Sequence, residues 1–314
     1  MTRGIIIAGA ATLVAAAIGA VALPGLMQGR ALEALKTRTL AELVFVQGGD
    51  FRNGTYSVTW QKPDGSRIDL PVRDASQSQT SKDVTLPSYY LQAHEADNAD
   101  FDMFLAATGR PEQYKSPQTS RGTAGVAAEM TWSEARDFCD WLGDVAGLNM
   151  RLPTENEWEF AARARGGTPP YATDNGQFLE GKNIHDTVIG NNPATRGVFG
   201  PSPMGFYNMA DGLYEWVGDM GRVRIAKGGS NVSSAAYETI PSRAVIEGFA
   251  KTADTVTLSD NAARYGAIKS DTLYLFNATA RCVADVTQAP AQSGFGTAPD
   301  LDAIGFPTIY VWPF

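Results

Sequence analysis

Apolar positions recur with a helical period in two stretches of the chain between residues 97 and 142. The first begins at the Asp-Asn pair of residues 97–98, either of which can cap a helix, and runs through Ala107. In the second, Thr131 and Glu134 have the spacing of a capping box. One face of this second helix is apolar and contains Cys139. The pattern therefore predicts two amphipathic helices, with Cys139 pointing into the core.

A third helical stretch follows a short loop. Residues 151–163 read RLPTENEWEFAAR, in which Thr154 can cap the helix and Glu157 can return the hydrogen bond. Trp158, Ala161 and Ala162 would form its buried side.

Shorter apolar strings predict strands elsewhere. Residues 44–86 alternate such strings with turn signals, including Pro-Asp-Gly at residues 63–65, which indicates strands and hairpins. After about residue 165 there is no long helical period, only short apolar runs among glycine, proline and asparagine. The expected fold class is therefore α+β, rich in loops and low in regular secondary structure.

The amino terminus carries a different pattern. Residues 4–28 form an uncharged, largely apolar run, which predicts a signal anchor or signal peptide over residues 1–28, with residues 5–26 in the membrane. Ala-Val-Ala at residues 20–22 would suit cleavage. Apolar residues at helical spacing then predict a stalk over residues 29–43, which favours anchoring. The predicted location is the periplasmic side of a bacterial inner membrane, or the periplasm after cleavage.

Composition and charge narrow the classes of function. With 314 residues, 44% apolar and 19% charged, the chain can form one large domain with a buried core. The net charge of −8 and the absence of a basic stripe exclude a nucleic-acid partner. We expect the six tryptophans to lie mainly in the core. His94 and His185 are the only histidines, so a three-histidine metal site is not expected.

Four ordered blocks resemble the formylglycine-generating enzymes, also called sulfatase-modifying factors. They are RLPTENEWEFAAR at residues 151–163, GFYNMADGLYEW at 205–216, KGGS at 227–230, and Arg281-Cys282. The resemblance implies a C-type-lectin-like fold for a domain over residues 44–285, with an insertion at about 243–273 and a C-terminal tail over 286–314.

The resemblance also implies a structural disulfide between Cys139 and Cys282. An even pair of cysteines in an exported chain is expected to be oxidised, and the alternative is two buried free thiols. The aromatic end of the tail would either fold into a groove of its own domain or dock on a partner.

The family's oxidative chemistry depends on two cysteines that this chain replaces. By residue count from Gly229, their positions fall on Ser233 and Glu238. Neither side chain holds copper(I) as a thiolate does, so no copper is expected. A residual catalytic site could still use Ser230, Tyr237 and Glu238, provided that burial raises the pKa of the Glu238 carboxyl.

Resembling proteins bind structural calcium within the second block. Asn208 and Glu215 stand at the side-chain positions of that site, and Asp211 and Leu213 at the carbonyl positions. Oxygen ligands in a loop suit Ca²⁺. The alternative is a tight turn held by hydrogen bonds. A second family site would begin at residues 183–184, but its acidic partner is missing, so we do not expect it.

Three functions follow. The leading hypothesis is an exported, membrane-anchored accessory or binding module without formylglycine-generating activity. The second is a divergent periplasmic enzyme that carries out oxidative tailoring of a secreted small molecule or protein through a site without cysteines. The third is a subunit of an envelope complex, assembled on an envelope protein partner.

Overall fold

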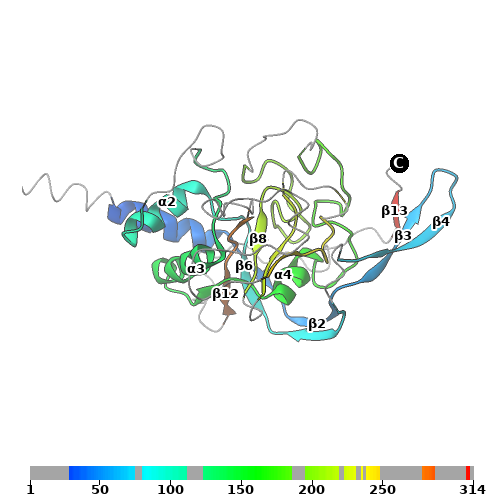
Figure 1. Ribbon diagram of the computed structural model, residues 1–314, viewed down its shortest axis with the longest axis horizontal. Helices are drawn as coiled ribbons and strands as arrows, with labels where there is room; N and C mark the ends of the chain where they lie inside the picture. Colours follow the sequence, from blue (N-terminus) through cyan, green and yellow to red (C-terminus); the bar gives the residue numbers. More distant parts are fainter. Residues whose placement is uncertain are drawn as a thin grey trace, which may run out of the picture.

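The computed structural model describes residues 28–74, 80–111, 123–185, 195–218, 223–230, 235, 238–247, 278–286 and 309–311. The helices of residues 98–107 and 132–146 lie at one side of the body. The short twisted sheets and the helix of residues 155–162 lie nearer its centre, and a long hairpin stands out from the opposite side (Figure 1). The mixture of helix and sheet with long loops agrees with the expected α+β class.

The three predicted helices are confirmed, with their caps. Helix α2 (Asn98–Ala107) is capped by Asp97, whose side chain accepts from the Asp100 amide. Helices α3 (Trp132–Ala146) and α4 (Glu155–Ala162) each begin with a complete capping box. These caps satisfy amides that the first helical turn leaves without partners, which is why each helix starts at its predicted residue.

Two four-stranded sheets form the centre of the domain. The first has the order β1 (Leu43–Val46), β6 (Tyr89–Gln92), β12 (Val283–Asp285), β7 (Met150–Arg151), and all its neighbours are antiparallel. The second has the order β10 (Ala244–Glu247), β9 (Val223–Lys227), β8 (Tyr214–Trp216), β11 (Ala278–Thr279). The first sheet therefore joins strands from near both ends of the domain, whereas the strands of the second sheet all lie between residues 214 and 279.

Two smaller sheets come from the predicted hairpin region. Strands β2 (Gly49–Arg52) and β5 (Asp83–Leu86) pair antiparallel. Strands β3 (Tyr56–Gln61) and β4 (Arg67–Val72) form the projecting hairpin around the predicted turn at residues 63–65. A C-terminal strand, β13 (Ile309–Val311), adds in parallel to the free edge of β3. Residues 309–311 of the tail thus pack on their own domain, which was one of the two predicted alternatives.

Two large apolar clusters hold these elements together. One joins the buried faces of α2 and α3 to the first sheet and includes Phe101, Phe104 and Phe138. The other surrounds α4 and includes Trp158 and Phe160. Trp132, Trp158 and Trp216 are buried, and each donates its indole N–H to an acceptor in the core. The expectation that tryptophans are core residues holds for these three.

The disulfide is confirmed. Cys139 on α3 and Cys282, directly before β12, are bonded at a sequence separation of 143, and neither side chain is exposed. The amphipathic pattern had placed Cys139 inward, and α3 does bury it.

The predicted stalk is helical over residues 28–41 but does not stand apart from the domain. Leu35 is buried in the same apolar cluster as Leu43 and Phe101, because the helix turns its apolar face onto the body. Arg38 also pairs with Asp100 on α2. The segment is therefore part of the domain, which corrects its assignment as a separate stalk.

Other predicted segments are described only in part. The membrane segment of residues 1–28 lies outside the described residues except for its last residue. Among the described helices, none has the length and apolar character needed to cross a bilayer. The predicted insertion begins as strand β10, and residues 248–277 lie outside the described part.

Candidate functional site

The second and third sequence blocks meet at two glycines. A methyl group on Gly228 would lie 2.5 Å from the Met209 carbonyl oxygen, and one on Gly229 would lie 2.5 Å from the Ala210 carbonyl oxygen. Only glycine allows this approach of the two backbones. Ser230, Asp211 and the segment around residue 238 are consequently gathered in one place.

Charged side chains on α4 hold the strand that leads into this site. Lys227 is fully buried, and its Nζ lies 3.5 Å from Glu155 Oε1 and 3.9 Å from Glu159 Oε2. Arg243 forms two hydrogen bonds to the Glu155 carboxylate, and Arg163 pairs with Glu159 at 3.0 Å. These buried charges are mutually neutralised, so we assign them a positioning role.

Glu238 is the chemically distinctive residue of the site. Its side chain is 2% exposed, and its carboxyl group packs on Gly229, where an added methyl would lie 2.5 Å from Glu238 Cγ. No residue in the described part of the chain forms a hydrogen bond to its Oε2 atom. A buried carboxyl group with an oxygen that no described residue hydrogen-bonds is a candidate acid or base.

Burial sets the protonation state of Glu238. It raises the pKa of this carboxyl to about 9, with smaller contributions from the negative charges of Asp211 and Glu180. Tyr171 lies near enough that burial, together with the charge of Glu238, raises the pKa of its hydroxyl to about 12. At neutral pH both groups therefore carry their protons. The sequence hypothesis required that burial raise the pKa of the Glu238 carboxyl, and burial does raise it.

This protonation predicts a measurable pH dependence of stability. The folded protein keeps the Glu238 proton up to a pKa of about 9, whereas the unfolded chain loses it near 4.5, so stability falls as pH rises between these values. We expect Glu238→Gln to remove this loss and to be more stable than the wild type at alkaline pH. Urea unfolding of both proteins across that range measures the difference.

Glu33 provides the matched control for this experiment. Its side chain is exposed to solvent on the helix of residues 28–41. Glu33→Gln should therefore leave the pH dependence of stability unchanged. Identical profiles for wild type and Glu238→Gln would contradict the assignment of a buried proton to Glu238.

The other predicted catalytic residues have different outcomes. Ser230 is buried at 1% exposure, next to Gly229. Tyr237 and Ser233 lie outside the described residues, so their predicted positions stay predictions. Tyr171 was not predicted, because nothing in the sequence near residue 171 connects it to residue 238. The backbone supplies the connection, since the Ile240 amide donates to the Pro170 carbonyl at 3.1 Å.

His185 and Asp211 form a buried pair beside the site. The Asp211 carboxylate accepts from the His185 amide at 2.9 Å and also contacts the imidazole Nδ1. His94 is stacked on the Tyr207 ring, with 4.3 Å between centroids. Burial, followed by the charges of Arg196 and Arg281, lowers the pKa of His94 to about 3, so this ring is neutral. Both rings therefore pack against neighbouring side chains of the domain.

The residues predicted to bind calcium have protein partners in this structure. Glu215 is fully buried, and its two oxygens accept from Arg281 at 2.6 and 2.8 Å and from the Trp158 indole at 2.7 Å. The Asn208 amide group donates to the Thr195 carbonyl, and its oxygen accepts weakly from the Gly197 amide. The Leu213 amide faces Glu95.

Asn208, Asp211, Leu213 and Glu215 are the residues predicted to hold calcium, and in this structure the carboxylate of Glu215 is paired with the guanidinium of Arg281. Arg281 already provides the positive charge that a carboxylate needs in a buried site. No trio of metal-ligating His, Cys, Asp or Glu side chains occurs among the described residues. Calcium at this loop stays a prediction.

A melting experiment tests it. Because Arg281 neutralises Glu215, we expect EDTA to leave the melting temperature unchanged. A rise in melting temperature on adding millimolar calcium chloride to EDTA-treated protein would instead show that a cation binds the folded state.

Glu95 is a buried carboxyl that sequence reasoning missed. It is 1% exposed, and none of the described residues forms a hydrogen bond to its Oε2 atom. Burial, together with the nearby charge of Glu215, raises the pKa of Glu95 well above its usual range. Its position in the EADNADF segment gave no signal of this, because the Glu95–Glu215 proximity arises only on folding.

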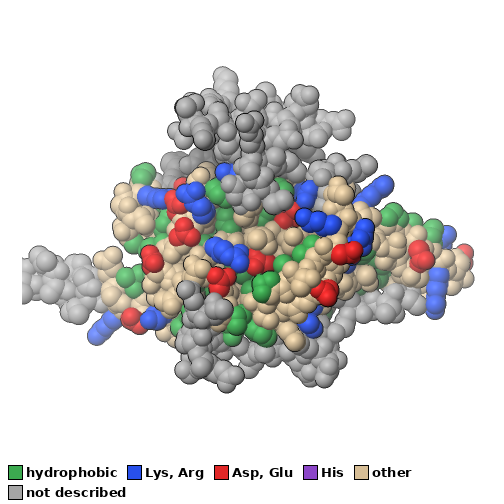
Figure 2. Space-filling model, turned by 90° about the horizontal axis from the view of Figure 1, so that it is seen from below, with side chains coloured by type: hydrophobic (Ala, Val, Ile, Leu, Met, Phe, Trp, Pro, Cys, Tyr) green, Lys and Arg blue, Asp and Glu red, His purple; other side chains and the backbone are tan. Residues whose placement is uncertain are grey.

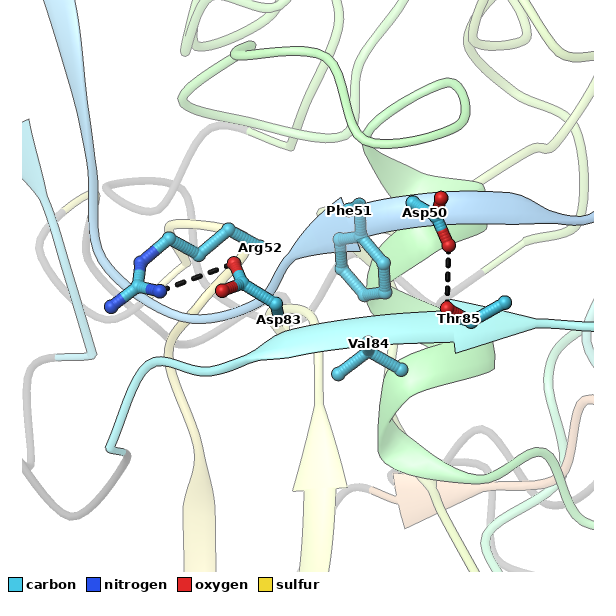
Figure 3. A pocket seen from close by; sticks show the side chains of 6 residues that line it. All are labelled: Asp50, Phe51, Arg52, Asp83, Val84 and Thr85. Carbon is cyan, nitrogen blue, oxygen red and sulfur yellow. Dashed lines mark hydrogen bonds and ion pairs between the residues drawn. The ribbon is translucent and has the colours of Figure 1, made fainter.

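The surface hollow between β2 and β5 is not part of this site. Figure 3 shows its six lining side chains, in which Arg52 pairs with Asp83 and Thr85 donates to Asp50. Its polar groups therefore have partners across the ribbon, and none of the predicted site residues lines it. On the face drawn in Figure 2, basic and acidic side chains are interspersed.

Comparison with protein families gives one match that covers most of the chain. The family described as "Sulfatase-modifying factor enzyme 1-like domain" matches residues 29–255. Formylglycine-generating enzyme from Mus musculus is 22% identical over 290 residues, covering 68% of this chain and 71% of that protein. Inactive C-alpha-formylglycine-generating enzyme 2 from Bos taurus is 24% identical over 275 residues, covering 67% of this chain and 82% of that protein.

Other relatives share only part of their length. Serine/threonine-protein kinase Pkn1 from Chlamydia trachomatis is 28% identical over 198 residues, but the match spans 57% of this chain and 28% of the kinase. Among solved structures, PvdO from Pseudomonas aeruginosa matches with a TM-score of 0.53 and 19% identity, covering 78% of this chain and 95% of PvdO. That likeness supports the fold.

Proposed function

Because the chain belongs to the family of sulfatase-modifying factor enzyme 1-like domains, we propose that it is an exported accessory or binding module that lacks the family's cysteine-dependent oxidation. One observation carries the proposal. The chain has two cysteines, and both are used in the buried Cys139–Cys282 disulfide. The family's oxidation uses copper(I) held by cysteine thiolates, which are ligands that select this ion, and the disulfide leaves no free thiolate.

An assay on a sulfatase-type cysteine peptide tests the proposal. We expect mass spectrometry to detect no conversion of the peptide cysteine to formylglycine, with or without copper, while an active formylglycine-generating enzyme converts it in parallel. The same assay on protein reduced with dithiothreitol makes Cys139 and Cys282 available as thiols. Conversion under either condition would refute the proposal.

Export is the second part of the proposal. It is supported by the apolar run of residues 5–26 and by the pairing of both cysteines, since disulfides persist in oxidising compartments. Fusing residues 1–43 to a phosphatase that is active only in the periplasm tests it. We expect activity in the membrane fraction if the segment anchors and in the soluble fraction if it is cleaved. An inactive fusion that accumulates inside the cell would exclude export.

A divergent enzyme is the second candidate function, and Glu238 favours it. This buried, protonated carboxyl with one free oxygen can donate a proton to a ligand and take it back. Tyr171 is the neighbouring hydroxyl that could orient such a ligand, and Ser230 is buried next to Gly229, on which Glu238 packs. If catalysis takes place here, Glu238→Gln should reproduce the cellular phenotype of a deletion while the protein stays folded. A full rescue by Glu238→Gln would count against the enzyme and favour the accessory role.

A further inference from the structure

The C-terminal strand occupies an edge that would otherwise be open. Strand β13 pairs in parallel with β3, and Tyr310 lies opposite Trp60. The other edge of β3 is already paired with β4. In Figure 1 the β3–β4 hairpin stands out from the body, with β13 beside it. An exposed strand edge presents free amide and carbonyl groups, so it readily accepts an added strand.

A slot beside β3 receives the side chain of Tyr310. This side chain is 1% exposed and packs with Val58 and Val72, and its ring centroid lies 5.6 Å from that of Trp60. The opposite wall is the loop of residues 169–176. A methyl group on Gly176 would lie 2.8 Å from the Tyr310 hydroxyl, so only glycine leaves room for it. The slot is therefore shaped for an aromatic side chain.

The polar end of Tyr310 is poorly matched to this slot. Burial raises the pKa of its hydroxyl, which keeps the proton. No described residue forms a hydrogen bond with it. A buried donor without an acceptor loses its hydrogen bonds to water without replacement, which weakens the attachment. The strand is also only three residues long. A peptide that binds the edge of β3 more tightly could therefore displace the C-terminal strand.

The slot is connected to the candidate site. Tyr56 on β3 donates its hydroxyl proton to the Pro169 carbonyl, and the next residue, Pro170, accepts from the Ile240 amide. Thr239 donates to the Arg73 carbonyl at the end of β4. A peptide in the slot would therefore contact the loop of residues 169–176 and the β3–β4 hairpin. Both are hydrogen-bonded to residues 239 and 240, next to Glu238.

We propose that the edge of β3 and the slot beside it form a binding site for an extended peptide, and that β13 is a built-in competitor for that site. The peptide pairs in parallel with β3 and inserts one aromatic side chain flanked by β-branched residues, as in the Ile-Tyr-Val of residues 309–311. The peptide is the class of partner that the accessory role proposed above would need. The peptide site rests on the proposed function only for this link to an accessory role.

Peptide exchange in a nicked protein tests the proposal. A protease site placed between residues 286 and 309 of the full chain allows the tail to leave after cleavage. The probe is a fluorescent peptide with the sequence of residues 305–314, followed by anisotropy. We expect the nicked protein to bind it and the uncut protein to bind at least about tenfold more weakly, since the tethered tail competes at high effective concentration.

Two variant peptides separate slot recognition from general stickiness. Tyr310→Ala should bind at least about tenfold more weakly than the native sequence, because it leaves the slot empty. Tyr310→Phe should bind as tightly or more tightly, because it removes the hydroxyl that lacks a partner. A nicked, disulfide-bonded and folded protein that fails to bind the native peptide would overturn the proposal. A dimer of the uncut chain that is lost on deleting residues 309–311 would also overturn the proposal. In that case the strand would pair with a second copy of the chain. Neither result depends on the formylglycine assay.

Discussion

Replacing Cys139 and Cys282 together by serine should lower the free energy of unfolding by roughly 4 to 5 kcal/mol, the largest single loss that we expect. The disulfide closes a loop with a sequence separation of 143 residues, and removing it lets the unfolded chain explore many more conformations. It joins α3 to the segment that leads into β12, so it also ties the helical layer to the first sheet. Urea unfolding of the oxidised wild type and the double variant measures the loss.

Reduction of the wild type provides the control for this experiment. Wild-type protein unfolded in the presence of dithiothreitol should approach the stability of the double variant, while the double variant should not respond to dithiothreitol. Equal stability of the oxidised wild type and the double variant would show that the bond constrains the unfolded chain little.

Arg281→Met should destabilise the domain by about 3 to 5 kcal/mol, because it leaves a buried carboxylate without its counter-charge. Arg281 is fully buried and binds both oxygens of Glu215. Its guanidinium also donates to the carbonyls of Gln92, Ala93 and Tyr207, which would lose their partner as well. The loss is measured as a lower midpoint and a lower free energy in urea unfolding.

The pair Arg52–Asp83 is the matched control, since it has the same two functional groups at the surface. Its side chains are 59% and 85% exposed. Arg52→Ala should therefore change the free energy of unfolding by no more than about 1 kcal/mol. The double variant Arg281→Met, Glu215→Leu should recover much of the stability, because no buried charge is left. Failure of Arg281→Met to destabilise beyond Arg52→Ala would contradict the role assigned to Arg281.

The predicted features that the structure confirmed are mostly local. Thr131 with Glu134 and Thr154 with Glu157 lie three residues apart, so their hydrogen bonds can be read directly from the chain. The inward direction of Cys139 follows from the helical period in the same way. The pairing of Cys139 with Cys282 came from family resemblance, since spacing alone does not choose disulfide partners.

The features that sequence analysis missed depend on residues far apart in the chain. Arg281 and Glu215 are 66 positions apart, so their ion pair could not be read from the chain. The helix of residues 28–41 was expected to be a stalk, since its apolar residues do not reveal which surface covers them. Glu238 was identified by counting from Gly229, but its burial and its raised pKa were visible only in the fold.

The sequence by itself determined the family and the residues at which the three helices begin, because these depend on residue identity and on hydrogen bonds within one helical turn. Only the tertiary structure decided which charge neutralises Glu215, that Glu238 holds its proton, and that the C-terminal strand fills the edge of β3. Ion pairing, desolvation and strand addition act through space, so their strength depends on distances and burial that the order of residues does not encode locally.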